Sequence, residues 1–108
     1  MSLTVNLYYT GVNGNAGKFA DEMESSGVAG AIRAEKGNLR YDYFIPMSDP
    51  ETVLLIDSWE SQEALDAHHA SPMMEQIAML REKYDLHMSV ERYISSGDDD
   101  HDSSWIRK

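Results

Sequence analysis

Alternation of apolar and polar residues predicts four β-strands along the chain. In residues 4–9, Val5, Leu7 and Tyr9 share one side of an extended segment and the intervening polar or mixed residues share the other. Further strands are predicted over residues 39–45, 53–59 and 88–94. The segment 53–59 begins as a continuous apolar run, which is typical of a central strand covered on both faces.

Two stretches between these strands show helical spacing instead. In the first, the apolar residues recur at intervals of three and four, with Asn15 as a candidate N-cap, and the helix is predicted to resume over residues 29–35 before Gly37 ends it. In the second, Ser61 is a candidate N-cap, and Ser71 with Pro72 indicates a fresh helix start. The apolar residues of these helices are Ala16, Phe19, Ala20, Met23, Ala64, Leu65, Met73, Ile77, Leu80 and Tyr84.

The resulting order, β-α-β-β-α-β, predicts an α+β fold of the ferredoxin-like type, with the first and third strands at the sheet centre. Helices on one face leave the other face of the sheet uncovered. A chain of this length has no further elements to cover that face, so we expect a homodimer.

Length and composition narrow the class of protein. At 108 residues and 12.2 kDa the chain has room for one domain, predicted over residues 1–95, followed by an acidic tail over residues 96–108 that we expect to be disordered. The absence of cysteine excludes disulfides, thiolate metal sites and a cysteine nucleophile, and favours a cytoplasmic location. The start of the chain lacks the basic region of a secretory signal, and its longest apolar run is far too short to span a membrane.

The charge of the chain disfavours polyanionic partners, and its glycine spacing disfavours nucleotide binding. A formal net charge of -10 makes nucleic acid and anionic membranes poor partners. Gly11, Gly14 and Gly17 follow the first strand, but their spacing fits neither a dinucleotide fingerprint nor a phosphate-binding loop, so we interpret them as a turn.

A few residues remain as candidates for chemistry. His68 and His69 are helical neighbours about 100° apart, so they cannot chelate one metal ion, but either imidazole is a base near neutral pH or a hydrogen-bonded helix histidine. Glu35 is a pocket carboxylate or a solvated helix end. Trp59 and the strand tyrosines, Tyr8 and Tyr41 among them, are packing residues or parts of a pocket.

The runs Ile32 to Tyr41, Asp49 to Glu60 and Ala64 to Met74 contain the motifs E-x-G-x-x-x-Y, W-E and A-H-x-x-S-P in order. In these motifs the chain resembles the antibiotic biosynthesis monooxygenases, including quinol monooxygenases. The resemblance implies a dimeric α+β barrel with a pocket between sheet and helices in each subunit. Many quinol monooxygenase relatives read T-P-H-M where this chain reads S-P-M-M, so a second pocket histidine is missing unless His69 substitutes for it.

By this resemblance we expect a cofactor-independent monooxygenase that acts on a small phenolic or quinol-like substrate and dioxygen, with no metal. His68 would remove a hydroxyl proton, with Glu35 as the second catalytic residue, and the resulting anion would reduce dioxygen directly. Alternatives are an isomerase of a small phosphorylated sugar using Glu35 and His68, a haem-degrading enzyme, and a non-catalytic binding dimer. The residues expected to bind substrate are Asn6, Tyr8, Tyr41, Trp59, His69 and Met73.

Overall fold

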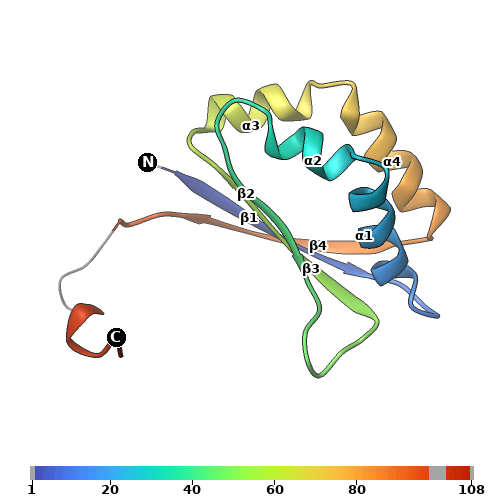
Figure 1. Ribbon diagram of the computed structural model, residues 1–108, viewed down its shortest axis with the longest axis horizontal. Helices are drawn as coiled ribbons and strands as arrows, with labels where there is room; N and C mark the ends of the chain where they lie inside the picture. The colour runs from blue at the N-terminus through green and yellow to red at the C-terminus, as the bar shows by residue number, and fades with distance from the viewer. Residues whose placement is uncertain (1, 98–101, 108) are drawn as a thin grey trace.

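The computed structural model describes residues 2–97 and 102–107 (Figure 1). Each predicted helical stretch is divided into two helices, as the interruptions in the sequence indicated. The elements are β1 (Leu3–Thr10), α1 (Asn15–Ser25), α2 (Val28–Arg33), β2 (Asn38–Phe44), β3 (Thr52–Trp59), α3 (Gln62–His69), α4 (Met73–Lys83), β4 (His87–Ile94) and a single 3-10 turn, η1 (Asp102–Ser104).

The four strands form one antiparallel sheet in the order β2-β3-β1-β4. The strands β1 and β3 therefore lie at the centre, as predicted, and the two helical crossovers give the ferredoxin-like α+β fold. All four α-helices lie on one side of this sheet (Figure 1). The opposite face carries no element of the described chain.

The core lies between the sheet and these helices. Alternation along β3 directs Val53, Leu55 and Trp59 toward the helices, and all three are fully or almost fully buried. Phe19 and Met23 on α1 fill the space opposite them, and the rings of Phe19 and Tyr9 lie 4.9 Å apart. The helical spacing and the strand alternation thus converge on one packed layer.

Two of the three predicted helix caps are displaced by one residue. Gly14, not Asn15, caps α1, because its left-handed backbone (φ 75°) suits glycine and its N–H donates to Glu51. Asn15 is the first helical residue and donates from its side chain to the carbonyl of Tyr84. At α4 the N-cap is Pro72, not Ser71. The Ser61 cap of α3 is confirmed, since its hydroxyl accepts from the N–H of Ala64 at 3.1 Å.

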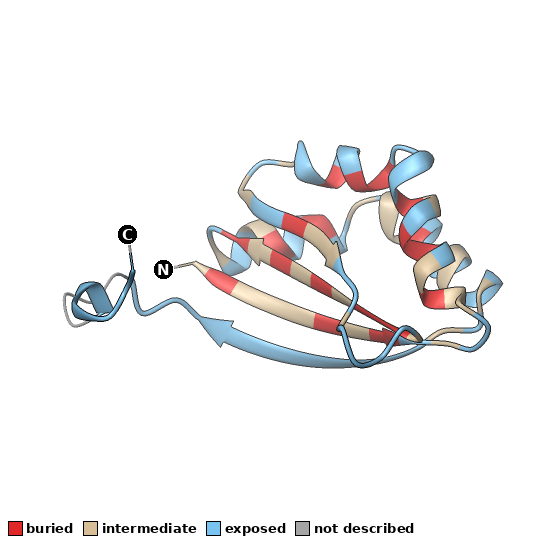
Figure 2. Cartoon of the chain, turned by 60° about the horizontal axis from the view of Figure 1, so that its bottom comes forward, coloured by how far each residue is buried: buried red, intermediate tan, exposed pale blue. Residues whose placement is uncertain are grey.

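The strand β4 is exposed along its whole length (Figure 2). Pairing with Leu7 and Tyr9 directs Val90 and Met88 to the helix side of the sheet, yet these side chains are 52% and 42% exposed. The helices therefore cover β1, β2 and β3 but not β4.

The sheet face without helices carries apolar and aromatic side chains, including Phe44 and Tyr93, which are 40% and 50% exposed. We expect this face to pair with a second copy of the chain, because an exposed apolar face of a sheet marks an interaction surface. A stable interface there would bury at least roughly 1,000 Å² in total. Sedimentation at micromolar concentration should then give one species of twice the 12.2 kDa chain mass. A single species at the chain mass would contradict the homodimer.

The predicted tail is described only in part, and its disorder stays a prediction. Within residues 102–107 every residue is exposed, including Trp105, and η1 is the element there. Residues 98–101 and 108, which the tail prediction also includes, lie outside the described residues. In the described parts of the chain, none of the helices has the length and apolar character that crossing a membrane requires.

Candidate active site

His68, Trp59 and Glu35 form a buried cluster between sheet and helices. The imidazole of His68 stacks on the Trp59 indole, with ring centroids 4.9 Å apart and planes 23° apart. Its Nδ1 lies 3.0 Å from Oε1 of Glu35. The His68 side chain is 3% exposed and that of Glu35 18%. Glu35 is therefore a partner of His68 and not a solvated helix end.

A glycine turn explains how Glu35 comes to face His68. After α2 the chain turns at residues 34–37, and the N–H of Asn38 donates to the carbonyl of Glu35. Gly37 adopts φ 86°, and a Cβ placed on it would lie 2.6 Å from Cβ of Ala64 on α3. Only glycine allows this turn to pack so closely on α3, the helix that carries His68. The spacing of Glu35 and Gly37 in the sequence motif thus has a steric cause.

Asp57 is a further polar residue of this cluster that the sequence analysis missed. It lies on the helix side of β3, is 5% exposed, and its Oδ1 accepts from Nε1 of Trp59 at 2.6 Å. Burial raises the pKa of Asp57 to about 6, against smaller opposing effects of the Trp59 hydrogen bond and of His68. An acid at an inward position of an apolar strand was the available sequence signal.

Tyrosines and one arginine extend the polar lining of the interior. Arg81 on α4 donates to the Tyr9 hydroxyl from Nε at 3.1 Å and from Nη2 at 2.8 Å. The Tyr43 hydroxyl donates to that of Tyr41 at 3.2 Å, and Tyr41 is the cross-strand neighbour of Asp57. Burial raises the pKa of both Tyr41 and Tyr43, so these hydroxyls stay protonated and act as hydrogen-bond donors or acceptors.

The remaining predicted substrate-binding residues do not all join this cluster. Asn6 and Tyr8 lie on the sheet face opposite His68, because they pair with Ile56 and Leu54, whereas the helix side of β1 carries the odd-numbered residues. His69 is exposed, and its ring lies 5.6 Å from that of His68. Partial desolvation of its imidazole, with a smaller contribution from His68, lowers the pKa of His69. Met73, at the start of α4, is partly buried against the core. One cluster therefore contains Glu35, Trp59 and His68 with Tyr41 nearby, but not Asn6 or Tyr8.

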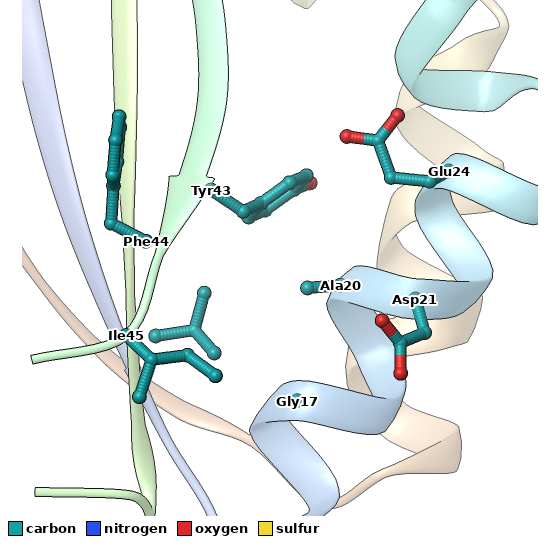
Figure 3. A pocket seen from close by; sticks show the side chains of 8 residues that line it. Gly17, Ala20, Asp21, Glu24, Tyr43, Phe44 and Ile45 are labelled. Carbon is teal, nitrogen blue, oxygen red and sulfur yellow. The ribbon is translucent and has the colours of Figure 1, made fainter.

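A cavity of about 280 Å³ lies between α1 and the end of β2 (Figure 3). Asp21 and Glu24 line it from the helix, and Tyr43 and Ile45 line it from the strand side. His68 is not among its lining residues. The Tyr43 side chain lines the cavity, and its hydroxyl donates a hydrogen bond to Tyr41. Tyr41 is in turn the cross-strand neighbour of Asp57.

No group of three or more His, Asp or Glu side chains in the described parts of the chain could hold a metal ion. The cluster offers one imidazole, with its Nδ1 engaged by Glu35. The His68 ring itself is buried and stacked on Trp59.

The raised pKa of Asp57 predicts a pH-dependent stability cost. A pKa of about 6 in the folded state, well above that of a solvent-exposed aspartate, means that the folded state binds the proton more tightly, so stability falls as pH rises through this window. Asp57→Asn should therefore stabilise the protein by about 1–3 kcal/mol at pH 8 and by much less at pH 4. Urea unfolding of both proteins at the two pH values measures this, and a difference independent of pH would contradict it.

Comparison with known proteins decides the family. The family model described as antibiotic biosynthesis monooxygenase matches residues 2–79, which include β1 through most of α4. The chain belongs to the antibiotic biosynthesis monooxygenase family. A search of curated proteins finds no match for this family member.

Solved structures with the same fold accompany this family assignment. The protein PA3566 from Pseudomonas aeruginosa is 22% identical, with a TM-score of 0.74, and the match covers 89% of this chain and 95% of that one. SnoaB, a cofactor-independent oxygenase from Streptomyces nogalater, is 13% identical, with a TM-score of 0.73 and coverage of 90% and 95%. At identities this low, the likeness to these two structures shows a shared fold and nothing further about this antibiotic biosynthesis monooxygenase family member.

Proposed function

We propose that this protein is a cofactor-independent monooxygenase of a small phenolic or quinol-like substrate, with His68 as the base. The observation that carries the proposal is the contact of Glu35 with the buried His68 ring, which stacks on Trp59. The described function of SnoaB, a cofactor-independent oxygenase of the same fold, supports this reaction class.

The contact with Glu35 determines which nitrogen of His68 would act. A carboxylate accepts hydrogen bonds, so Nδ1 of His68 carries the proton that it shares with Glu35 at 3.0 Å. The second nitrogen, Nε2, then has a free lone pair and can remove a proton from a substrate hydroxyl. Glu35 in turn stabilises the imidazolium that forms, which is the role of the third group in nucleophile and base arrangements.

Loss of its proton makes the substrate electron-rich. The phenolate transfers an electron to dioxygen, and the two radicals combine at a ring carbon that bears hydrogen. The peroxide anion that forms takes back the proton held by His68, and the resulting hydroperoxide loses water. One oxygen atom stays in the product as a new carbonyl and the other leaves as water, so the substrate supplies all the electrons. The apolar surroundings of Trp59 and Leu65 exclude water from this step.

The proposal also requires side chains to move. Because only 3% of His68 is exposed, a substrate reaches its ring only when neighbouring side chains give way. Met73 and Met74, at the start of α4, are partly buried against the core, and methionine is the most adaptable apolar side chain for such a movement.

Oxygen consumption tests the proposed function. A panel of hydroquinones, naphthols and anthrone-like phenols is added to purified protein in chelator-treated buffer, and dioxygen uptake is followed with an electrode. We expect uptake above the autoxidation rate with at least one class of phenol. Uptake equal to that of heat-unfolded protein across the whole panel would refute the monooxygenase.

A further inference from the structure

Asp57 is a charged residue in a position where an apolar residue would be more stable. The other helix-side residues of β3 are Val53, Leu55 and Trp59, which are all buried and uncharged. The neighbours of Asp57 across the sheet are Val5 on β1 and Tyr41 on β2. Placing a carboxylate there costs desolvation energy that a leucine would not.

The hydrogen bond to Trp59 does not by itself require a buried carboxylate. A buried indole N–H needs an acceptor, and Nε1 of Trp59 finds it in Oδ1 of Asp57 at 2.6 Å. The amide oxygen of an asparagine at this position would accept the same hydrogen bond without a charge. What distinguishes Asp57 from such an asparagine is its negative charge.

The charge has one neighbour that the proposed reaction makes positive. Asp57 and His68 attract each other when His68 is protonated. Asp57 also accepts the hydrogen bond of the Trp59 indole N–H, and His68 stacks on that indole. The other ionisable groups around Asp57 are Glu35 after α2, Arg81 on α4, Tyr41 on β2 and Tyr9 on β1. Glu35 opposes the negative charge of Asp57, whereas Arg81 favours it.

We propose that Asp57 is a positioning residue for His68: it fixes the plane of the Trp59 indole against the imidazole, and its carboxylate stabilises the protonated ring. The order of contacts is Asp57 to Trp59 to His68 to Glu35, so two carboxylates act on one imidazole, Glu35 directly and Asp57 across the indole. The consequence for catalysis rests on the proposed function, whereas the effects on Trp59 and His68 do not.

Three variants separate the hydrogen bond of Asp57 from its charge. Asp57→Asn keeps an acceptor for Trp59 and removes the charge, and Asp57→Leu removes both. Asp42→Asn is the matched control, because Asp42 is a half-exposed acid on the neighbouring strand β2. Asp42 pairs with Ile56, so its side chain lies on the sheet face without helices. The indole N–H signal of Trp59 and the ring signals of His68 are followed by NMR between pH 4 and 9, with Trp105→Phe used to assign the two indoles.

We expect the proton affinity of His68 to fall by roughly threefold to tenfold in Asp57→Asn and to stay unchanged in Asp42→Asn. The downfield indole signal of Trp59 should persist in Asp57→Asn and shift strongly in Asp57→Leu. An unaltered His68 titration in Asp57→Asn, or an equal change in the Asp42→Asn control, would overturn the proposal.

Oxygen uptake adds the catalytic readout. With a phenol that the wild-type protein oxidises, Asp57→Asn should lower kcat by about tenfold and leave KM within about twofold, because the charge acts on the base and not on substrate contacts. A kcat equal to that of the wild type would overturn the catalytic part. If the wild-type protein consumes no dioxygen but the NMR changes occur, the proposed function fails and the placement of Asp57 on Trp59 and His68 is supported.

Discussion

His68→Gln is expected to lower the rate of phenol-dependent oxygen uptake by about two to four orders of magnitude. Glutamine can donate to Glu35 as the imidazole does, but it has no nitrogen that accepts a proton near neutral pH, and general bases contribute on this scale. The measurement is kcat from initial oxygen uptake, with far-ultraviolet circular dichroism to show that the variant is folded.

The matched control is His69→Gln on the same helix. Since His69 is exposed, we expect its replacement to change kcat by no more than a few fold. Alanine is the poorer test at position 68, because removing a buried ring stacked on Trp59 leaves a cavity and costs about 2–4 kcal/mol of stability. Retained activity in His68→Gln would show that His68 is a packing residue, and an equal loss in His69→Gln would contradict a role specific to His68.

Gly37→Ala is expected to cost about 2–4 kcal/mol of unfolding free energy. The added methyl group would require a non-glycine residue at φ 86° and would also lie 2.6 Å from Cβ of Ala64, so backbone strain and overpacking add together. Urea unfolding at neutral pH measures the loss. Because the clash pushes α3 away from the turn that carries Glu35, oxygen uptake should fall as well.

Gly27→Ala separates these two costs. Gly27 has the same φ of 86°, but a Cβ there would meet no atom within 4 Å. Its replacement should therefore cost only the strain, about 1 kcal/mol, and leave oxygen uptake nearly unchanged. Equal losses of stability in the two variants would refute the close approach between Gly37 and α3.

The fold was predictable because each element has a local signal. Strand alternation in residues 4–9 and helical spacing around Phe19 are properties of the residues themselves, and they led to the observed element order. The displaced cap of α1 shows where local reasoning stops. Asn15 has the better capping side chain, but Gly14 takes the position because its backbone can adopt the left-handed conformation and bind Glu51 from the β2–β3 connection.

The candidate site was predictable only in part, for a different reason. Alternation separates the two faces of β1 but does not say which face the helices cover, so Asn6 and Tyr8 were grouped with residues on the other face. The contact between Glu35 and His68 joins positions 33 residues apart and depends on tertiary packing. Asp57, in contrast, shares its strand face with Val53 and Trp59, and an acid in that pattern was a usable signal.

Oxygen-18 labelling tests whether the protein transfers one atom of dioxygen to its substrate. A phenol that supports oxygen uptake is incubated with the protein under oxygen-18 gas in a buffer that contains a metal chelator. The mass of the product is measured by mass spectrometry before its carbonyl oxygen exchanges with water. We expect one oxygen-18 atom in the product of the wild-type protein and loss of this labelled product in His68→Gln. A product free of oxygen-18, with hydrogen peroxide formed in equal amount, would contradict a monooxygenase.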